Sequence, residues 1–311
     1  MLAYVVRRLM ILVLIVFAVT VIAFAMMHMV PGNPARIMAG LDASEEDIAL
    51  MEKKLGLDRP LYAQYLDYMG GLIRGDFGQS IRTGRSVSKI LFSRYPATLE
   101  LALTAILMAL IVSIFGGVIA ATHHNTIVDN FTMIGALFGV SMPSFWRGLM
   151  LMFLFSLILG WLPASGRGTP FTLAGLKHLV LPAVTLGIGS AAYLVRLIRS
   201  SMLEILNEEY VRTARSKGLR ERSVIYKHAL KNALIPIVTM TGMQFGYLLG
   251  GAVVIETVFA WPGVGRLMIN SVFARDFPVV QGAILMLAVS FSLVNLFVDL
   301  AYAFLDPRIR Y

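Results

Sequence analysis

The sequence has 311 residues, of which 58% are hydrophobic and 14% are charged, and it contains no cysteine. Soluble domains average roughly 45–50% apolar and about 25% charged residues, so this composition indicates a membrane protein and excludes disulfide or thiol chemistry. The formal net charge is +9, but because the basic residues gather near both ends and in one interval between apolar segments, membrane topology accounts for it and nucleic-acid binding is not expected.

The first predicted element is a membrane span at residues 9–30, directly after Arg7 and Arg8. A secretory signal peptide would have a shorter apolar stretch, about 7–15 residues, followed by a site of small residues. The stretch here is longer and its end, at 26–30, is rich in methionine. We therefore expect an uncleaved first span with its N-terminus in the cytoplasm.

A polar excursion at 31–97 separates this span from the next and contains helix start and stop signals. Ser44 precedes three acidic residues and predicts a helix start, whereas Gly56 predicts the end of that helix. A second amphipathic helix is expected at 60–74, and Ser86 is expected to begin a short third one. The sequence therefore predicts a small, helical, extracytoplasmic cap.

Five further apolar stretches predict a single-domain core at 98–304, which makes the whole chain, 1–311, one all-α membrane domain with six transmembrane helices. The third stretch is too long for a straight crossing and contains Pro143, where we expect a kink. An even number of spans places both termini in the cytoplasm. The expected stretches are 98–121, 131–159, 179–198, 233–255 and 280–304.

The interval 200–236 carries nine basic residues, counting Arg196 and Arg199 just before it, against four glutamates. A loop this basic is expected on the cytoplasmic side. Gly218 predicts a helix end and Ser223 a second helix start, with an apolar stripe at helical spacing before them that comprises Leu203, Leu206, Tyr210 and Ala214. Such a hairpin can lie on lipid headgroups or dock into a groove on a soluble partner.

Particular residues of this interval resemble a known family. Tyr-Val-Arg-Thr-Ala-Arg-Ser-Lys-Gly-Leu at 210–219 and His-Ala-Leu-Lys-Asn-Ala-Leu-Ile-Pro at 228–236 resemble the coupling loop of ABC importer permeases. The general Glu-Ala-Ala pattern falls here on Arg-Thr-Ala, a substitution that resembles the dipeptide, oligopeptide, glutathione and nickel branch. Further segments similar to that branch lie at 29–34, 256–265 and 306–310.

The resemblance implies a type I importer architecture in a bacterial plasma (inner) membrane. It also implies partners: a second homologous permease, two cytoplasmic ATPases that bind ATP and Mg, and an extracytoplasmic solute-binding protein that rests partly on the cap. ATP-driven closure of the two ATPases would push on the 201–230 helices and open the transport path toward the outside. The residues implied in this coupling are Glu209, Tyr210, Arg212, Thr213, Ala214, Gly218 and Leu219.

Two groups of residues are candidates for the transport path. Gly242, Gly246 and Gly250 are four residues apart, so they share one helix face and allow a close helix approach, either within the chain or to the second permease. Pro143 and Arg147 lie within the third apolar stretch. An arginine inside a span is a functional candidate, so Arg147 either holds a peptide carboxylate or, if the long third helix is shifted, reaches toward an interface or pairs with another residue.

Catalytic signatures such as GxxxxGK[ST], GxSxG and HExxH do not occur in the sequence. We therefore expect no enzyme activity, no catalytic residues, no metal site and no cofactor in this chain.

The favoured cargo is a dipeptide or glutathione, with nickel or a metal chelate as the alternative within the family. A stand-alone secondary transporter is the alternative of a different class, and ATPase partners would distinguish the two. Asp299 is expected to pair with a basic residue at the inner surface.

Overall fold

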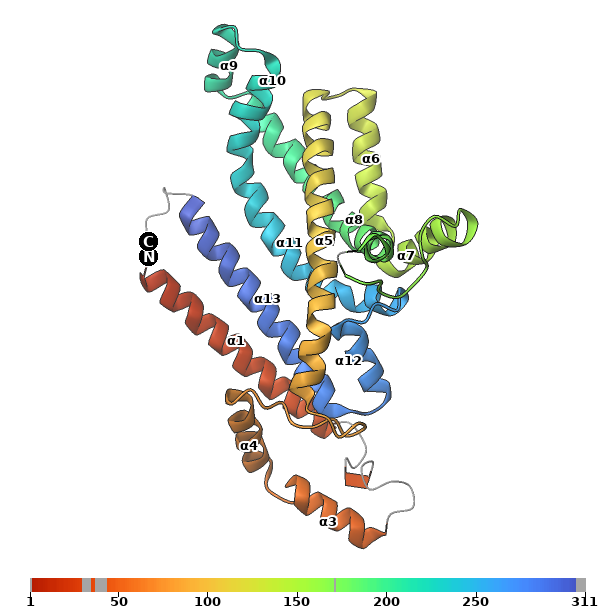
Figure 1. Cartoon of the computed structure of the whole chain (residues 1–311). Coiled ribbons are helices and arrows are strands. Elements are labelled where there is room, and N and C mark those ends of the chain that lie inside the picture. The colour runs from red at the N-terminus through yellow and green to blue at the C-terminus, as the bar shows by residue number, and fades with distance from the viewer. Residues whose placement is uncertain (1, 30–34, 37–43, 171, 306–311) are drawn as a thin grey trace.

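The computed structural model describes residues 2–29, 35–36, 44–170 and 172–305, which form a helical bundle with a smaller helical cap at one end (Figure 1). The cap lies at the bottom of the view and a hairpin of short helices lies at the opposite end. Within the described residues, the β-type pairing consists of an isolated bridge between Gln79 and Ser86. The predicted all-α fold is confirmed.

The cap contains α3 (Glu45–Leu55) and α4 (Leu61–Ile73). The predicted start of α3 is confirmed, because the Ser44 hydroxyl accepts a hydrogen bond from the Asp47 amide while the Asp47 carboxylate accepts one from the Ser44 amide. This reciprocal pair satisfies amides that have no partner inside the helix. Gly56 ends α3 in the left-handed conformation, with φ of 69°.

The second span is longer than predicted, because α5 runs from Val87 to Thr122 with Pro96 inside it. The short helix expected after Ser86 is therefore wrong as a separate element: it is the first part of α5, and Ser86 makes no side-chain cap. A proline removes only one backbone donor, and a bundle can tolerate that loss where neighbouring helices hold both sides of the break.

The third apolar stretch is a broken span rather than a kinked helix. Helices α6 (Ile127–Ser141) and α7 (Ser144–Met152) meet at Pro143 with a bend of 106°. A π-helical segment, Phe153–Ile158, continues α7. The position of the predicted break at Pro143 is confirmed, but the chain turns through more than a right angle there.

The remaining long helices are α8 (Leu173–Leu206), α11 (Leu230–Val258) and α13 (Phe277–Leu305). Together with α1 (Leu2–Met29) and α5, they give five helices long and apolar enough to cross a membrane, and the α6–α7 pair supplies a sixth crossing if it is counted as one span. Helix α12 (Val264–Phe273) replaces part of the irregular loop expected between the last two spans.

The core is built where α5 crosses α8, and α11 packs beside both (Figure 1). Small residues permit this approach: a Cβ on Gly117 would lie 2.6 Å from Ile198, and one on Gly187 would lie 2.7 Å from the Ala105 carbonyl oxygen. Apolar helices in a membrane associate mainly through such close packing. The α5–α8 pair is therefore the fixed frame on which the other helices are placed.

Helix α1 lies along α13 at the margin of the bundle (Figure 1). Near the start of α1, Arg8 forms an ion pair with Asp299 of α13, with an N–O distance of 2.6 Å. The predicted pairing of Asp299 with a basic residue is confirmed. The pair satisfies two charges that would be costly to leave alone near an apolar environment.

Candidate functional site

A hairpin of short helices projects from the end of the bundle opposite the cap (Figure 1). Helix α8 ends at Leu206, α9 (Glu209–Ser216) crosses the tip, and α10 (Glu221–Ser223) leads through a π-helical segment into α11. Gly218 lies between α9 and α10 with φ of 76°, which confirms the predicted left-handed turn. The predicted cap at Ser223 is wrong, because Ser223 is already helical and Arg220 occupies the cap position.

The inner face of α9 is held by a small apolar cluster. Val211 and Ala214 of α9 are buried against Val224, and the end of α8 packs against them. Ala214 was expected among the residues that couple to a partner, but it is only 7% exposed. Its methyl group faces the chain itself, so it positions α9 and offers little surface for contact.

The outer face of α9 and the turn that follows it carry the other candidate coupling residues. All six of them are exposed: Glu209, Tyr210, Arg212, Thr213, Gly218 and Leu219. The Tyr210 hydroxyl accepts a hydrogen bond of 2.7 Å from the Asn232 side chain, which links this face directly to the first turn of α11. A force applied to α9 would therefore be transmitted to a spanning helix.

An ion pair closes the turn between α9 and α10. The Arg215 guanidinium donates two hydrogen bonds to the Glu221 carboxylate, at 2.8 and 3.3 Å. This hydrogen bonding, with the favourable charge beside it, lowers the pKa of Glu221 and raises the pKa of Arg215. A bidentate pair restricts the relative orientation of the two helices more than a single contact would.

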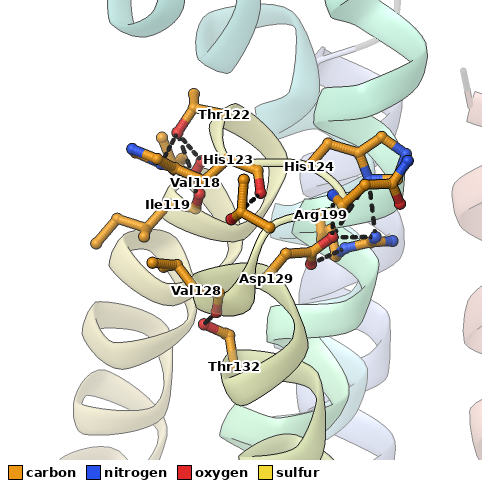
Figure 2. Close-up of polar contacts among 11 residues, drawn as sticks. Val118, Ile119, Thr122, His123, His124, Val128, Asp129, Thr132 and Arg199 are labelled. Atoms are coloured by element: carbon orange, nitrogen blue, oxygen red, sulfur yellow. Dashed lines mark hydrogen bonds and ion pairs between the residues drawn. The ribbon is translucent and has the colours of Figure 1, made fainter.

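A second polar cluster, at the α5–α6 turn near this end of the bundle, was not predicted from the sequence (Figure 2). Asp129 is 2% exposed, and its carboxylate accepts hydrogen bonds of 2.6 and 2.7 Å from Arg199 of α8. It also accepts one from the Asn125 amide, and His124 lies 3.3 Å away. The cluster fixes α6 to the part of α8 that continues toward α9. The sequence did contain a signal for this contact: Asp129 is an acidic residue in the first turn of an apolar helix, and Arg199 is a basic residue near the end of a span.

Arg147 lies at the break between α6 and α7 and is 9% exposed. Its guanidinium donates to the carbonyl oxygens of Gly139 and Met142 at the end of α6, and to that of Thr185 in α8. The contacts with Gly139 and Met142 satisfy carbonyl groups that the broken helix leaves without partners, and they place a positive charge at the negative end of the α6 dipole. The contact with Thr185 ties the break to α8. Arg147 therefore holds the bend, and Pro143 provides it.

The glycine stripe of α11 faces mainly α13 of the same chain. A Cβ on Gly242 would overlap Val298, and one on Gly246 would lie 3.0 Å from Phe291. Gly250 has open space beside it. The interpretation as helix packing within the chain thus applies to the first two glycines, whereas Gly250 lies where another helix can approach.

A buried carboxylate organises the segment between α11 and α12. Glu256 is fully buried and accepts hydrogen bonds from the Thr98 hydroxyl, at 2.7 Å, and from the Arg266 amide, at 2.9 Å. The Trp261 indole donates to the Ala97 carbonyl oxygen at 2.8 Å. Glu256 therefore caps the start of α12 and joins α5, α11 and α12.

Of the other segments that resemble the family, residues 30–34 and residues 306–310 lie outside the described residues.

Comparison with known proteins gives matches along the chain. Residues 113–311 match the model of the family described as "Binding-protein-dependent transport system inner membrane component", and residues 1–102 match the model of its N-terminal part. A dipeptide transport system permease of Alkalihalophilus pseudofirmus is 43% identical, and a glutathione transport system permease of Escherichia coli is 45% identical. Each alignment covers 100% of both chains.

Solved structures with a similar fold are also membrane transporters. An inward-facing MetNI methionine ABC transporter has a TM-score of 0.57 at 17% identity, covering 70% of this chain and 96% of that one. An amino acid ABC transporter crystallised with histidines has a TM-score of 0.52 at 16% identity, covering 71% of this chain and 95% of that one. At these identities the likeness concerns the fold.

Proposed function

Because the chain belongs to the family of binding-protein-dependent transport system inner membrane components, we propose that it is the permease subunit of an ATP-driven importer of small peptides. The observation that carries this proposal is the full-length similarity, at 43 and 45% identity, to permeases named for dipeptide and glutathione transport. The chain is a multi-span protein of the bacterial inner membrane.

The exposed face of α9 is the proposed docking site for a cytoplasmic ATPase. Its inner face is anchored by Val211 and Ala214, and its turn is closed by the Arg215–Glu221 pair, so α9 moves as one body with its surroundings. The contact between Tyr210 and Asn232 connects that body to α11. Closure of an ATPase dimer would thus shift α11 relative to the α5–α8 frame.

The proposed complex also contains a second homologous permease, a second ATPase and an extracytoplasmic solute-binding protein that loads peptide. ATP and Mg would bind to the ATPases. In this arrangement both termini and the α9 hairpin lie in the cytoplasm, and the α3–α4 cap lies outside. The open space beside Gly250 is a proposed contact of α11 with the second permease, along the path.

The experiment that tests this function is peptide uptake into proteoliposomes. The chain would be reconstituted with the second permease, the ATPases and the binding protein of its own source, and labelled dipeptide and glutathione would be offered separately. We expect uptake that requires internal ATP and the binding protein. Uptake by the chain with no ATPase present would instead indicate a secondary transporter, and ATP-driven uptake of nickel alone would replace the peptide assignment.

A further inference from the structure

A small cleft lined by two arginines opens toward the cap end of the bundle, between the N-terminal part of α5 and α12. Its volume is about 200 Å³, and it is lined by Arg94, Pro262, Gly263, Arg266, Leu267 and Asn270. Figure 1 places both the start of α5 and α12 toward the cap. The cleft is separate from the α9 hairpin.

The hydrogen-bonding groups of this cleft are only partly used. Among the described residues, the Arg94 side chain makes no hydrogen bond or ion pair, and Arg266 uses its side chain on one acceptor, the Ala260 carbonyl oxygen at 2.5 Å. Both side chains therefore retain N–H donors. Asn270 adds an exposed amide. Guanidinium groups are the side chains best suited to bind a carboxylate through paired hydrogen bonds.

The charge balance of the cleft is positive. The Glu256 carboxylate lies directly behind Gly263, one of the residues that line the cleft. Its oxygen atoms are already occupied by the Thr98 hydroxyl and by the amides at the start of α12. Two guanidinium groups against one buried, hydrogen-bonded carboxylate leave a net positive charge at the opening. An anion would relieve it.

The position of Arg94 on α5 indicates the direction from which an anion arrives. Arg94 lies on the same helical face as Leu91, Thr98 and Leu101, all of which are fully buried in the bundle. The opposite face of α5 carries large exposed apolar side chains suited to lipid contact, namely Phe92, Leu103 and Leu107. Arg94 is itself exposed, so its guanidinium is accessible on the side of α5 that faces the bundle.

We propose that Arg94, Arg266 and Asn270 form a carboxylate subsite at the outer end of the transport path, which takes the terminal carboxylate of an incoming peptide. This inference rests on the proposed function for the identity of the peptide. In this arrangement the cleft holds the carboxylate end of the cargo, and the peptide side chains make no contact that the subsite requires. It would select for a free carboxyl terminus.

Equilibrium binding to the assembled transporter tests the subsite without transport. The complex, in nanodiscs of zwitterionic lipid and without binding protein, would be titrated with a dipeptide and with the same dipeptide carrying a C-terminal amide. We expect the free acid to bind about tenfold more tightly, as the loss of a charge-assisted hydrogen bond implies. Equal affinity of the wild-type complex for the two peptides would overturn the proposal.

Variants locate the effect in the cleft. Arg94→Ala should abolish the preference for the free acid, Arg94→Lys should retain most of it, and Asn270→Asp should abolish it by charge repulsion. Arg82→Ala is the matched control, because Arg82 is an exposed arginine on the same side of the molecule that does not line the cleft. Unchanged thermal unfolding of Arg94→Ala would show that the fold is intact, and a retained preference in that variant would refute the subsite.

Two further measurements distinguish the peptide subsite from a lipid-headgroup site and from a docking surface for the binding protein. If phosphatidylglycerol in the nanodisc removes the wild-type preference, the site belongs to a lipid headgroup. If Arg94→Ala leaves the preference for the free acid intact but raises the binding-protein concentration needed to stimulate the ATPases, Arg94 belongs to a docking surface for the binding protein. Both results would refute the subsite. A failure of ATP-driven uptake with carboxylate-dependent binding intact would refute the proposed function alone.

Discussion

At the scale of single residues, two buried charged side chains, Arg147 and Glu256, hold irregular backbone in place. Each satisfies backbone groups that a helix end leaves without partners: carbonyl oxygens at the end of α6 for Arg147, and amides at the start of α12 for Glu256. The sequence singled out Arg147, but only as a candidate substrate ligand or ion pair. In the structure it contacts backbone carbonyl oxygens of α6 and α8. Every residue has such a carbonyl group, so the sequence does not show which of them Arg147 contacts. This is why its contacts could not be predicted.

The first prediction concerns Arg147. Replacement by methionine should lower the free energy of unfolding by about 1–3 kcal/mol, because carbonyl groups at the α6–α7 break lose their donor. Lower peptide uptake should accompany the loss, with the apparent KM for peptide unchanged. Thermal unfolding in detergent and uptake kinetics would measure the two effects. A raised KM with normal thermal stability would instead place Arg147 in contact with the cargo.

The second prediction concerns Glu256. The change Glu256→Gln keeps the size of the side chain but turns an amide group toward the donors of Thr98 and Arg266. We expect a loss of about 1–3 kcal/mol in the free energy of unfolding, from the buried donor left unpaired. The matched control is Glu209→Gln on the exposed face of α9. If the two variants unfold at the same temperature, Glu256 does not cap α12.

At the scale of elements, local signals predicted the two cap helices well, but they misplaced the helix starts expected at Ser86 and Ser223 and the ends of the long helices. Ser44 and Gly56 fixed α3, because their effects act within one turn. Prolines 96, 182 and 236 lie inside α5, α8 and α11, although proline in a sequence suggests a boundary. Packing of the bundle outweighs the lost hydrogen bond, and packing cannot be read from neighbouring residues.

The third prediction concerns the turn after α9. Gly218→Val forces a β-branched residue to a φ of 76°, at a cost of about 1–2 kcal/mol, although a Cβ there would meet no neighbouring atom. The hairpin should reorient, so ATP hydrolysis should continue while uptake per ATP falls. Gly218→Asn is the control, because asparagine tolerates this conformation. An unchanged ratio of peptide transported to ATP hydrolysed in the valine variant would argue against the role of α9.

The fourth prediction concerns the Arg215–Glu221 pair and its pH dependence. The pKa of Glu221 is lowered in the folded chain, so the pair stabilises the hairpin above the ordinary glutamate pKa and is lost as pH falls through the lowered value. At neutral pH, Glu221→Gln should speed amide hydrogen exchange in α9. Below the lowered pKa the variant and the wild type should exchange alike. Identical exchange at neutral pH would show that the pair does not hold the turn.

At the scale of the whole molecule, the positions of the apolar helices and the placement of the cap opposite the basic hairpin (Figure 1) followed from hydropathy and charge, and the expected six crossings are reached when the bent α6–α7 pair is counted as one span. The internal arrangement did not. The Asp129–Arg199 contact joins residues 70 positions apart, and α12 folds back under α5 through Glu256 and Trp261. Contacts at such separations depend on helix crossing geometry, for which one sequence offers no direct signal.

The fifth prediction tests the orientation in the membrane. The chain has no cysteine, so single cysteines can be introduced without background. Thr83→Cys, beside the cap, should react with a membrane-impermeant maleimide added to intact cells, whereas Ser216→Cys at the end of α9 should react only after permeabilisation. Labelling of both positions from one side would contradict a topology with six crossings and both termini inside.

The central claim is that the exposed face of α9 receives force from a separate ATPase. Photo-crosslinking tests it most directly: Thr213→Cys, which is exposed on α9, would carry a benzophenone in the assembled transporter, with Thr83→Cys as the control. We predict a covalent adduct between position 213 and an ATPase subunit, with a yield that changes when ATP is bound. Adducts with lipid alone, at any nucleotide state, would contradict the account.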